Sequence, residues 1–330
     1  MLRKLFACAA ALAAVAAAPA DARTEKIKVH GASLEGNLEG NSPDRDVYVF
    51  LPPSYDSTSD KRYPVVYFLH GYSVGADAYD GLAQFQEAVD TAAAAGNELI
   101  VVMPDAFTKF KGAMSGASVT TGDFPRFVAE DLVSYIDGNY RSIAEADSRG
   151  LSGHSMGGYG TLKIAMRYPG VFSSIYAMAP CCLSPRDMTL QEVAAAQAMT
   201  DEAIAKAGFA DAAGAAPLAA WAPDPTNPPH FFDDAARDGK IDPLFLARLH
   251  ANSPLVTLPQ HLPAMKALEA IRLEVGDKDF LLGDDTWMHE ELDRFGVAHE
   301  WRIFEGDHGN RVKARIRSDL LPFFGEHLDE

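Results

Sequence analysis

The chain has 330 residues, of which 48% are hydrophobic and 23% charged, and its formal net charge is −17. This is the composition of a globular protein with enough apolar residues for a large core. The strongly acidic balance repels nucleic acid and anionic lipid, so neither is an expected partner.

The first residues are predicted to be a signal peptide, 1–22. Arg3 and Lys4 form its positive start, residues 5–18 its apolar core, and a small-x-small cleavage site ends at Ala22. The apolar run is too short to span a bilayer comfortably, so a membrane anchor is the less favoured alternative. We expect an exported protein, periplasmic or secreted, without stable membrane insertion after cleavage.

Short β-rich runs alternate with helical patterns along most of the remaining chain. Residues 46–52 alternate like an antiparallel edge strand, whereas residues 64–70 and 99–105 are nearly continuous apolar runs, as in strands covered on both faces. The later predicted strands are 148–154, 171–180, 270–279 and 299–306, and the predicted helices are 127–140, 156–169, 285–296 and 310–324. This alternation predicts an α/β fold with a mostly parallel sheet, helices on both faces, and a single domain over residues 23–330.

The alternation breaks between Cys181 and about Leu262. This segment is Ala-rich with helical patches and then carries "WAPDPTNPPHFFDD", which no regular element is expected to hold. We predict a helical and irregular cap, about residues 181–262, packed over the carboxyl edge of the sheet, where ligands of open α/β sheets bind. A bridge between the adjacent Cys181 and Cys182 would be strained, so two free, partly buried thiols are expected.

The pattern Gly-x-Ser-x-Gly occurs twice, at residues 153–157 and 71–75. A nucleophilic serine of this kind needs a sharp strand-to-helix turn with the helix starting directly after it. The pattern predicts a helix immediately after Ser155, but only a loop after Ser73. Ser155 is therefore the predicted nucleophile, and the stretch "FLHGYS" is expected to supply an oxyanion donor. The two candidate donors are the backbone N–H groups of Tyr72 and Met156.

The base and the acid of such a site should follow late in the chain. His308, in "FEGDHGNR", lies between a predicted strand and the last helix, where it could reach back to the serine. An ordinary solvated loop histidine is the alternative. Asp277 and Asp279 both follow the preceding strand; a turn beginning at Gly276 would separate them, so that only one faces His308.

Several stretches together resemble the putative-esterase family of α/β-hydrolases, which includes esterase D, feruloyl esterases, enterochelin esterases and mycolyltransferases. They are "LPPSYD", "YPVVYFLHGY", "GLSGHSMGGYGTLKIAMRYPGVF", "GDKDF" and "GDHG". The resemblance covers about residues 46–183 and 269–324 and implies an α/β-hydrolase fold. It implies Ser155 as nucleophile, His308 as base and Asp279 as acid, with backbone donors at Tyr72 and Met156.

The leading hypothesis is an exported serine esterase that cleaves carboxylic esters of small molecules through an acyl-enzyme. No cofactor is expected and no metal ligands are predicted, because no histidine or cysteine cluster has ligand spacing. Acyl transfer to an alcohol is the nearest alternative, followed by a serine peptidase and a non-catalytic binding module. Export argues against glutathione thioesters as substrates. The oligomeric state and the acyl and alcohol specificity are left open.

Aromatic residues of the cap are the predicted substrate contacts. Trp221, Phe231 and Phe232 offer more apolar area than a surface loop should expose, and His154 beside the serine is a further candidate. Pinning the cap onto the body is the alternative role of the three aromatic rings. Three nearby carboxylates are expected to favour neutral over anionic esters: Asp224, Asp233 and Asp234.

Overall fold

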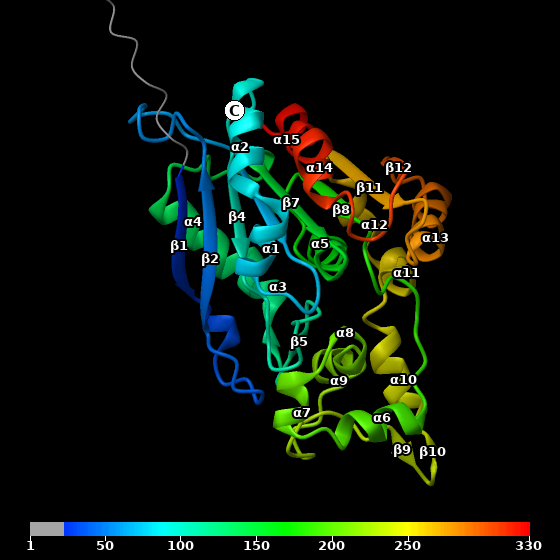
Figure 1. Cartoon of the computed structure of the whole chain (residues 1–330). Helices are drawn as coiled ribbons and strands as arrows, with labels where there is room; N and C mark the ends of the chain where they lie inside the picture. Colours follow the sequence, from blue (N-terminus) through cyan, green and yellow to red (C-terminus); the bar gives the residue numbers. More distant parts are fainter. Residues whose placement is uncertain (1–22) are drawn as a thin grey trace, which may run out of the picture.

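The computed structural model describes residues 23–330, so the predicted signal peptide lies outside the described residues (Figure 1). Its centre is an eight-stranded sheet with the order β1-β2-β4-β3-β7-β8-β11-β12. β2 is antiparallel to β1 and to β4, and the remaining neighbours are parallel. The strands are β1 (Arg23–His30), β2 (Asp44–Leu51), β3 (Val65–Leu69), β4 (Ile100–Pro104), β7 (Arg149–His154), β8 (Ser174–Met178), β11 (Ala270–Gly276) and β12 (Glu300–Phe304).

Consecutive strand residues feed two separate hydrophobic cores, because side chains alternate across a sheet. In β3, Val65 and Tyr67 belong to one core, whereas Val66 and Phe68 belong to the other. Both sets are fully buried, which explains the nearly continuous apolar run in the sequence. The predicted mostly parallel sheet with helices on both faces is confirmed.

Helices α1, α2 and α15 cover one face of the sheet, and α4, α5 and α13 cover the other (Figure 1). No helix within residues 23–330 is both long enough and apolar enough to cross a membrane. Outside the cap the helices are α1 (Ala76–Ala83), α2 (Phe85–Ala94), α3 (Phe124–Arg126), α4 (Val133–Asn139), α5 (Met156–Arg167), α12 (Leu262–Lys266), α13 (Leu282–Arg294), α14 (Val312–Arg315) and α15 (Leu321–His327). Short 3₁₀ turns are η1 (Ala32–Leu34), η3 (Ala146–Ser148) and η4 (Leu258–Gln260), and wide π turns are η2 (Phe127–Leu132) and η5 (Ile316–Leu320).

Two features of the sheet and its helices differ from the prediction. β2 is antiparallel as expected but is not the edge, because β1 pairs along its whole length and forms the edge itself. β1 reads "RTEKIKVH", whose apolar positions are too few to signal a strand, and its outer residues are exposed. The helix expected over residues 127–140 contains the π turn η2 before α4 begins.

The segment between β8 and α12 forms a body of short helices beneath the sheet, coloured green to yellow in Figure 1. Its interior is a third hydrophobic cluster that includes Phe232 and Phe245 from the cap and Met156 from α5. Trp221 ends a helix, which the sequence analysis did not expect. The cap elements are α6 (Leu190–Gln197), α7 (Asp201–Lys206), α8 (Phe209–Ala212), α9 (Ala215–Trp221), β9 (Ala236–Arg237), β10 (Lys240–Ile241), α10 (Pro243–His250) and α11 (Pro254–Thr257). A small hairpin of β5 (Ala117–Ser118) and β6 (Gly122–Asp123) lies nearby.

Candidate active site

Ser155 lies at the carboxyl end of β7 and directly precedes α5. Its backbone φ of 57° is in the left-handed region, which is rare for residues other than glycine. The Ser155 N–H donates to the Met178 carbonyl at 2.9 Å, and its carbonyl accepts from Tyr159 N–H inside α5. The residue is therefore held on a sharp, strained turn between a strand and a helix, as the sequence predicts.

Glycines on both sides of Ser155 allow β3, β7 and α5 to approach closely. A Cβ atom at Gly153 would lie 2.4 Å from the Gly157 backbone. A Cβ atom at Gly157 would lie 1.8 Å from the Leu69 carbonyl oxygen at the end of β3. Both contacts are backbone contacts that no side-chain rotation could relieve, so the turn requires glycine at these two positions.

His308 reaches Ser155 from the loop after β12. Its Nε2 lies 2.9 Å from Ser155 Oγ, and its Nδ1 lies 2.8 Å from Asp279 Oδ2. A carboxylate can only accept, so His308 Nδ1–H donates to Asp279 and the Nε2 lone pair faces the serine hydroxyl. The serine O–H can then donate to Nε2, which is the geometry of a nucleophile beside a general base.

Asp279 and Asp277 have different partners, because a turn begins at Gly276. The Asp279 N–H donates to the Gly276 carbonyl at 3.1 Å, which closes the turn. The Asp279 side chain is 0% exposed, and its Oδ1 accepts from Leu281 N–H at 2.9 Å. Asp277 is exposed and its Oδ1 accepts from Gly306 N–H. The sequence left two candidate acids, Asp277 and Asp279. In the structure it is Asp279 that contacts His308.

Two rings flank the His308 imidazole. The His154 ring lies 4.7 Å from it and the Phe280 ring 4.8 Å, centre to centre. His154 Nε2–H donates to the His308 carbonyl at 2.8 Å. Burial, with the neighbouring His308 as the second cause, lowers the pKa of His154 to about 4, so His154 is neutral at pH 7. His154 therefore packs against His308 as an uncharged ring.

The two predicted oxyanion donors lie near the serine. Met156 is the first residue of α5, where backbone N–H groups lack partners within the helix. Tyr72 follows β3 and lines the same cavity as Ser155. The next residue fixes its loop, because Ser73 N–H donates to the Lys111 carbonyl at 3.1 Å.

A cavity of about 310 Å³ opens beside Ser155 between the sheet edge and the cap. Most of its lining is apolar and comes from Tyr72, Met114, Met188, Phe209, Pro217, Trp221, Leu249, Phe280 and Leu281. Its charged lining residues are Arg186 and Asp284, one of each sign. Met114, Met188 and Phe280 were not predicted as lining residues, because they converge from positions that are far apart in the chain and share no local pattern.

The predicted substrate contacts are only partly placed at this cavity. Trp221 lines it, and its Nε1–H donates to the Met114 carbonyl at 3.1 Å. Phe232 is 0% exposed inside the cap, so it holds the cap together instead. Phe231 and His154 do not line the cavity either, His154 because it lies behind His308.

The carboxylates expected to repel anionic esters also lie outside the lining. Asp224 Oδ1 accepts from the Thr226 N–H and hydroxyl, and Asp233 pairs with Arg248. Asp234 Oδ1 accepts from Ala236 N–H. These three side chains therefore do not line the cavity, contrary to the expectation from the sequence. The preference for neutral over anionic esters stays a prediction.

Cys181 and Cys182 are free and partly buried, as expected, and both line the cavity. Their sulfur atoms lie 2.7 Å apart. The contact with Cys182 and burial raise the pKa of the Cys181 thiol well above its usual range. A thiol that resists ionisation is a poor nucleophile, so Ser155 is the better candidate in this cavity.

Comparison with known proteins places this arrangement in a class. The solved structure of a ferulic acid esterase superposes with a TM-score of 0.67 over 93% of this chain and 99% of that chain, at 20% identity. At this identity the likeness shows the fold, which is the α/β-hydrolase fold with its serine on a strand-to-helix turn. Residues 41–229 match the family model described as "Putative esterase". Because this match covers more than half of the chain, the protein belongs to that family.

Two curated relatives share part of the sequence. An esterase of Mycobacterium tuberculosis is 36% identical over 129 residues, which are 39% of this chain and 27% of the relative. An endo-1,4-beta-xylanase/feruloyl esterase of Xylanibacter ruminicola is 31% identical over 130 residues, 38% of this chain and 18% of the relative. The chain thus spans less than a third of the length of these relatives.

Proposed function

We propose that the protein is a serine hydrolase that cleaves carboxylic esters through an acyl-enzyme. The observation that carries the proposal is the pair of hydrogen-bond contacts made by His308. Its Nε2 contacts Ser155 Oγ and its Nδ1 contacts Asp279 Oδ2, both at less than 3 Å. Membership of the esterase family supports the same chemistry. The roles follow from the chemistry of each group.

Acylation begins when Ser155 Oγ attacks the ester carbonyl while His308 Nε2 takes the hydroxyl proton. Asp279 holds the ring in the tautomer with Nδ1–H and stabilises the imidazolium that forms. The proton then passes from Nε2 to the leaving alkoxide, which departs as an alcohol. A water molecule, deprotonated by the same Nε2, attacks the acyl-serine, and collapse of that intermediate releases the acid and restores the serine hydroxyl.

The negative charge that develops on the carbonyl oxygen needs donors that are already in place. The N–H groups of Tyr72 and Met156 are assigned this role, Met156 with the added field of the α5 N-terminus. Removing one such donor usually costs about 3 to 4 kcal/mol of transition-state stabilisation. The rings of His154 and Phe280 pack against the His308 imidazole and hold it in position beside Ser155 during both steps.

The substrate proposed for this site is an ester with an apolar or aromatic acyl group. The cavity beside Ser155 is mostly apolar, with Trp221 and Phe280 as flat surfaces for a ring. The relative from Xylanibacter ruminicola carries feruloyl esterase in its name, which supports an aromatic acid for this chain too. Arg186 and Asp284 at the same cavity offer polar partners for a substituent on the substrate.

Export is proposed from the sequence alone. The pattern of a positive start, an apolar core and a small-x-small site within residues 1–22 supports it. We therefore place the proposed esterase outside the cytoplasm, in the periplasm or the medium.

A panel of esters tests the proposal. The mature chain should hydrolyse phenyl, short-chain and hydroxycinnamoyl esters without added cofactor, and Ser155→Ala should reduce the rate to background. Ser73→Ala serves as the matched control and should keep most of the wild-type rate. Hydrolysis by the Ser155→Ala protein at the wild-type rate would contradict the proposal, as would a folded wild-type protein that cleaves no ester of the panel.

A further inference from the structure

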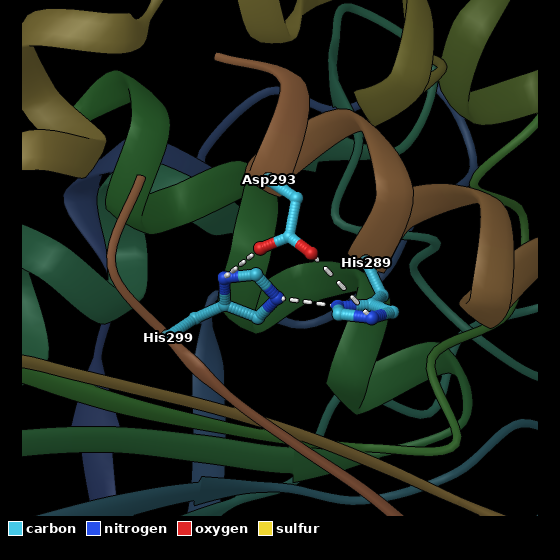
Figure 2. A group of neighbouring side chains, drawn as sticks. All are labelled: His289, Asp293 and His299. Carbon is cyan, nitrogen blue, oxygen red and sulfur yellow. Dashed lines mark hydrogen bonds and ion pairs between the residues drawn. The ribbon is translucent and has the colours of Figure 1, made fainter. Parts of the chain in front are cut away.

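Three potential metal ligands meet at the surface where α13 ends and β12 begins. His289 and Asp293 lie one turn apart on α13, and His299 follows in the segment that leads into β12 (Figure 2). One ligand atom from each residue lies within 4.8 Å of the other two. None of the three residues lines the cavity beside Ser155, so the group is a separate site from the proposed esterase site. No metal ligands were predicted from the sequence, because the connection between α13 and β12 interrupts any regular ligand spacing.

His299 is the fixed member of the group. Its side chain is 2% exposed, and its Nδ1–H donates to the Val297 carbonyl at 2.9 Å. A carbonyl can only accept, so the hydrogen is on Nδ1 and Nε2 carries a lone pair. A backbone carbonyl on the far nitrogen is the usual way in which proteins orient a metal-binding histidine.

The His299 Nε2 lone pair faces His289. His289 Nδ1 lies 2.8 Å away, and the His289 ring stacks on Trp301 of β12 at 5.1 Å and 11°. Without a cation His289 Nδ1–H donates to His299. If that proton moves to His289 Nε2, then His289 Nδ1 and His299 Nε2 both present lone pairs that can bind a metal ion. The shift releases no proton from the protein. If the two facing nitrogens move apart from 2.8 Å to roughly 3.3 to 3.4 Å, a tetrahedral cation fits between them at the usual Zn–N distance of about 2.0 to 2.1 Å.

Asp293 supplies the third ligand and the charge. Its Oδ2 lies 3.7 Å from His289 Nε2, its Oδ1 lies 4.0 Å from His299 Nδ1, and its side chain is 66% exposed. Both of these nitrogens carry the ring hydrogens in the metal-binding form, so the Asp293 side chain has to rotate toward the gap between the two facing nitrogens. Its exposure leaves room for that rotation. Two imidazoles and one carboxylate form a set that suits Zn²⁺ and similar transition metals better than Mg²⁺ or Ca²⁺.

We propose that His289, Asp293 and His299 bind a divalent transition metal of the Zn²⁺ class. The bound ion joins the end of α13 to the start of β12. α13 follows the loop that holds Asp279, and β12 leads into the loop that holds His308. The ion therefore fastens together the two elements from which these loops extend.

Titration of the metal-free, untagged mature chain with Zn²⁺ tests the site. Calorimetry should show one ion bound per chain, and Mg²⁺ should give no comparable heat. His289→Gln and Asp293→Asn should each weaken binding at least about tenfold. Asp187→Asn is the matched control, because it breaks another surface His–Asp pair, His250 with Asp187 at 2.8 Å, which has no third ligand among residues 23–330.

Thermal unfolding and cobalt spectra provide the second readout. Zn²⁺ should raise the Tm of the wild type and of Asp187→Asn equally, but not that of His289→Gln. Co²⁺ should give a visible absorption band with the wild type that His289→Gln lacks. Wild-type binding that is unchanged in both His289→Gln and Asp293→Asn would overturn the proposal, as would a wild type that binds no Zn²⁺ at millimolar concentration. If His289→Gln is unfolded without metal, the exposed Asp293→Asn variant decides.

Discussion

The two Gly-x-Ser-x-Gly turns, at residues 71–75 and 153–157, are alike in sequence but not in structure. Each follows a strand of the sheet, and both serines have positive φ, 67° for Ser73 and 57° for Ser155. The helix after Ser155 starts at the next residue, whereas α1 starts only at Ala76. Ser155 also faces His308, while Ser73 belongs to a loop tied to Lys111. The motif alone therefore does not identify a nucleophile; the immediate helix and the facing base do.

Replacing each serine tests this difference most strongly. Ser155→Ala should lower kcat by roughly 10⁶-fold, because it removes the attacking atom of a unit that works together. Ser73→Ala should leave most of the activity, since its hydroxyl has no assigned role. Steady-state kinetics on one activated ester gives both numbers. A larger loss for Ser73→Ala than for Ser155→Ala would reverse the assignment.

The carboxylates after β11 provide the next contrast. Asp279→Asn should reduce kcat by up to about 10⁴-fold, because an amide can hold His308 in the wrong tautomer. Asp277→Asn changes only a partly buried hydrogen bond from Gly306 N–H and should stay within a few fold of the wild type. The kcat of both variants, measured at the same pH, decides. A strongly reduced kcat for Asp277→Asn together with a near-normal kcat for Asp279→Asn would mean that the acid is misassigned.

Glycines near the two turns should differ in what they tolerate. Gly157→Ala pushes a Cβ into the Leu69 carbonyl and should destabilise the fold by about 3 kcal/mol or more. Gly81, in α1 after the Ser73 turn, has open space around its Cβ position. Gly81→Ala should leave stability unchanged or raise it by about 0.5 to 1 kcal/mol. Denaturant unfolding measures the free energy of unfolding of both variants. Similar values for Gly157→Ala and Gly81→Ala would contradict the close approach of Gly157 to the Leu69 carbonyl.

The cap allows the same kind of comparison between two aromatic residues. Trp221→Ala should raise KM for aryl esters by about tenfold, since it removes a flat apolar wall of the cavity. Phe232→Ala should lower Tm strongly, because a buried Phe→Ala change costs about 3 to 5 kcal/mol, but should leave KM unchanged. An unchanged KM for Trp221→Ala with a much lower Tm would assign the tryptophan to the scaffold alone.

Two buried aspartates near the site differ in their hydrogen-bond partners. Asp279 has partners for both oxygens, whereas among the described residues Asp285 has none, and burial raises its pKa well above the usual range. An unfolded aspartate titrates near pH 3.9, so above that pH folding must bind a proton at Asp285. Stability from this group is present below about pH 4 and is lost as pH rises toward the folded pKa.

Asp285→Asn should remove the loss of folding stability that the buried Asp285 carboxyl causes as the pH rises. Its Tm should match the wild type near pH 4 and exceed it by a few degrees at pH 7, which thermal melts across this range will measure. A Tm difference that does not change with pH would show that Asp285 does not take up a proton on folding.

The sequence was sufficient for the parts of the molecule whose signals are local. Continuous apolar runs predicted β3 and β4, and the helix pattern directly after Ser155 predicted the sharp turn. The Gly276 turn was enough to suggest that Asp277 and Asp279 face different ways, although the choice of Asp279 came from the family resemblance.

Features that depend on distant parts of the chain were not predictable. β1 forms because β2 offers a free edge, not because its own residues are strongly apolar. Phe232 lies in an irregular segment without periodicity, so nothing in the sequence showed that it faces the cap interior and not the cavity. The meeting of His289 with His299 likewise depends on how the chain connects α13 to β12.

Covalent labelling with a fluorophosphonate probe tests the central claim most directly. The probe reacts with an activated serine and stays attached, so peptide mass spectrometry identifies the residue that carries it. We expect a single adduct on Ser155, formed in the wild type and in Ser73→Ala and abolished in Ser155→Ala. An adduct on Ser73, or no adduct on the folded wild-type protein, would contradict the account.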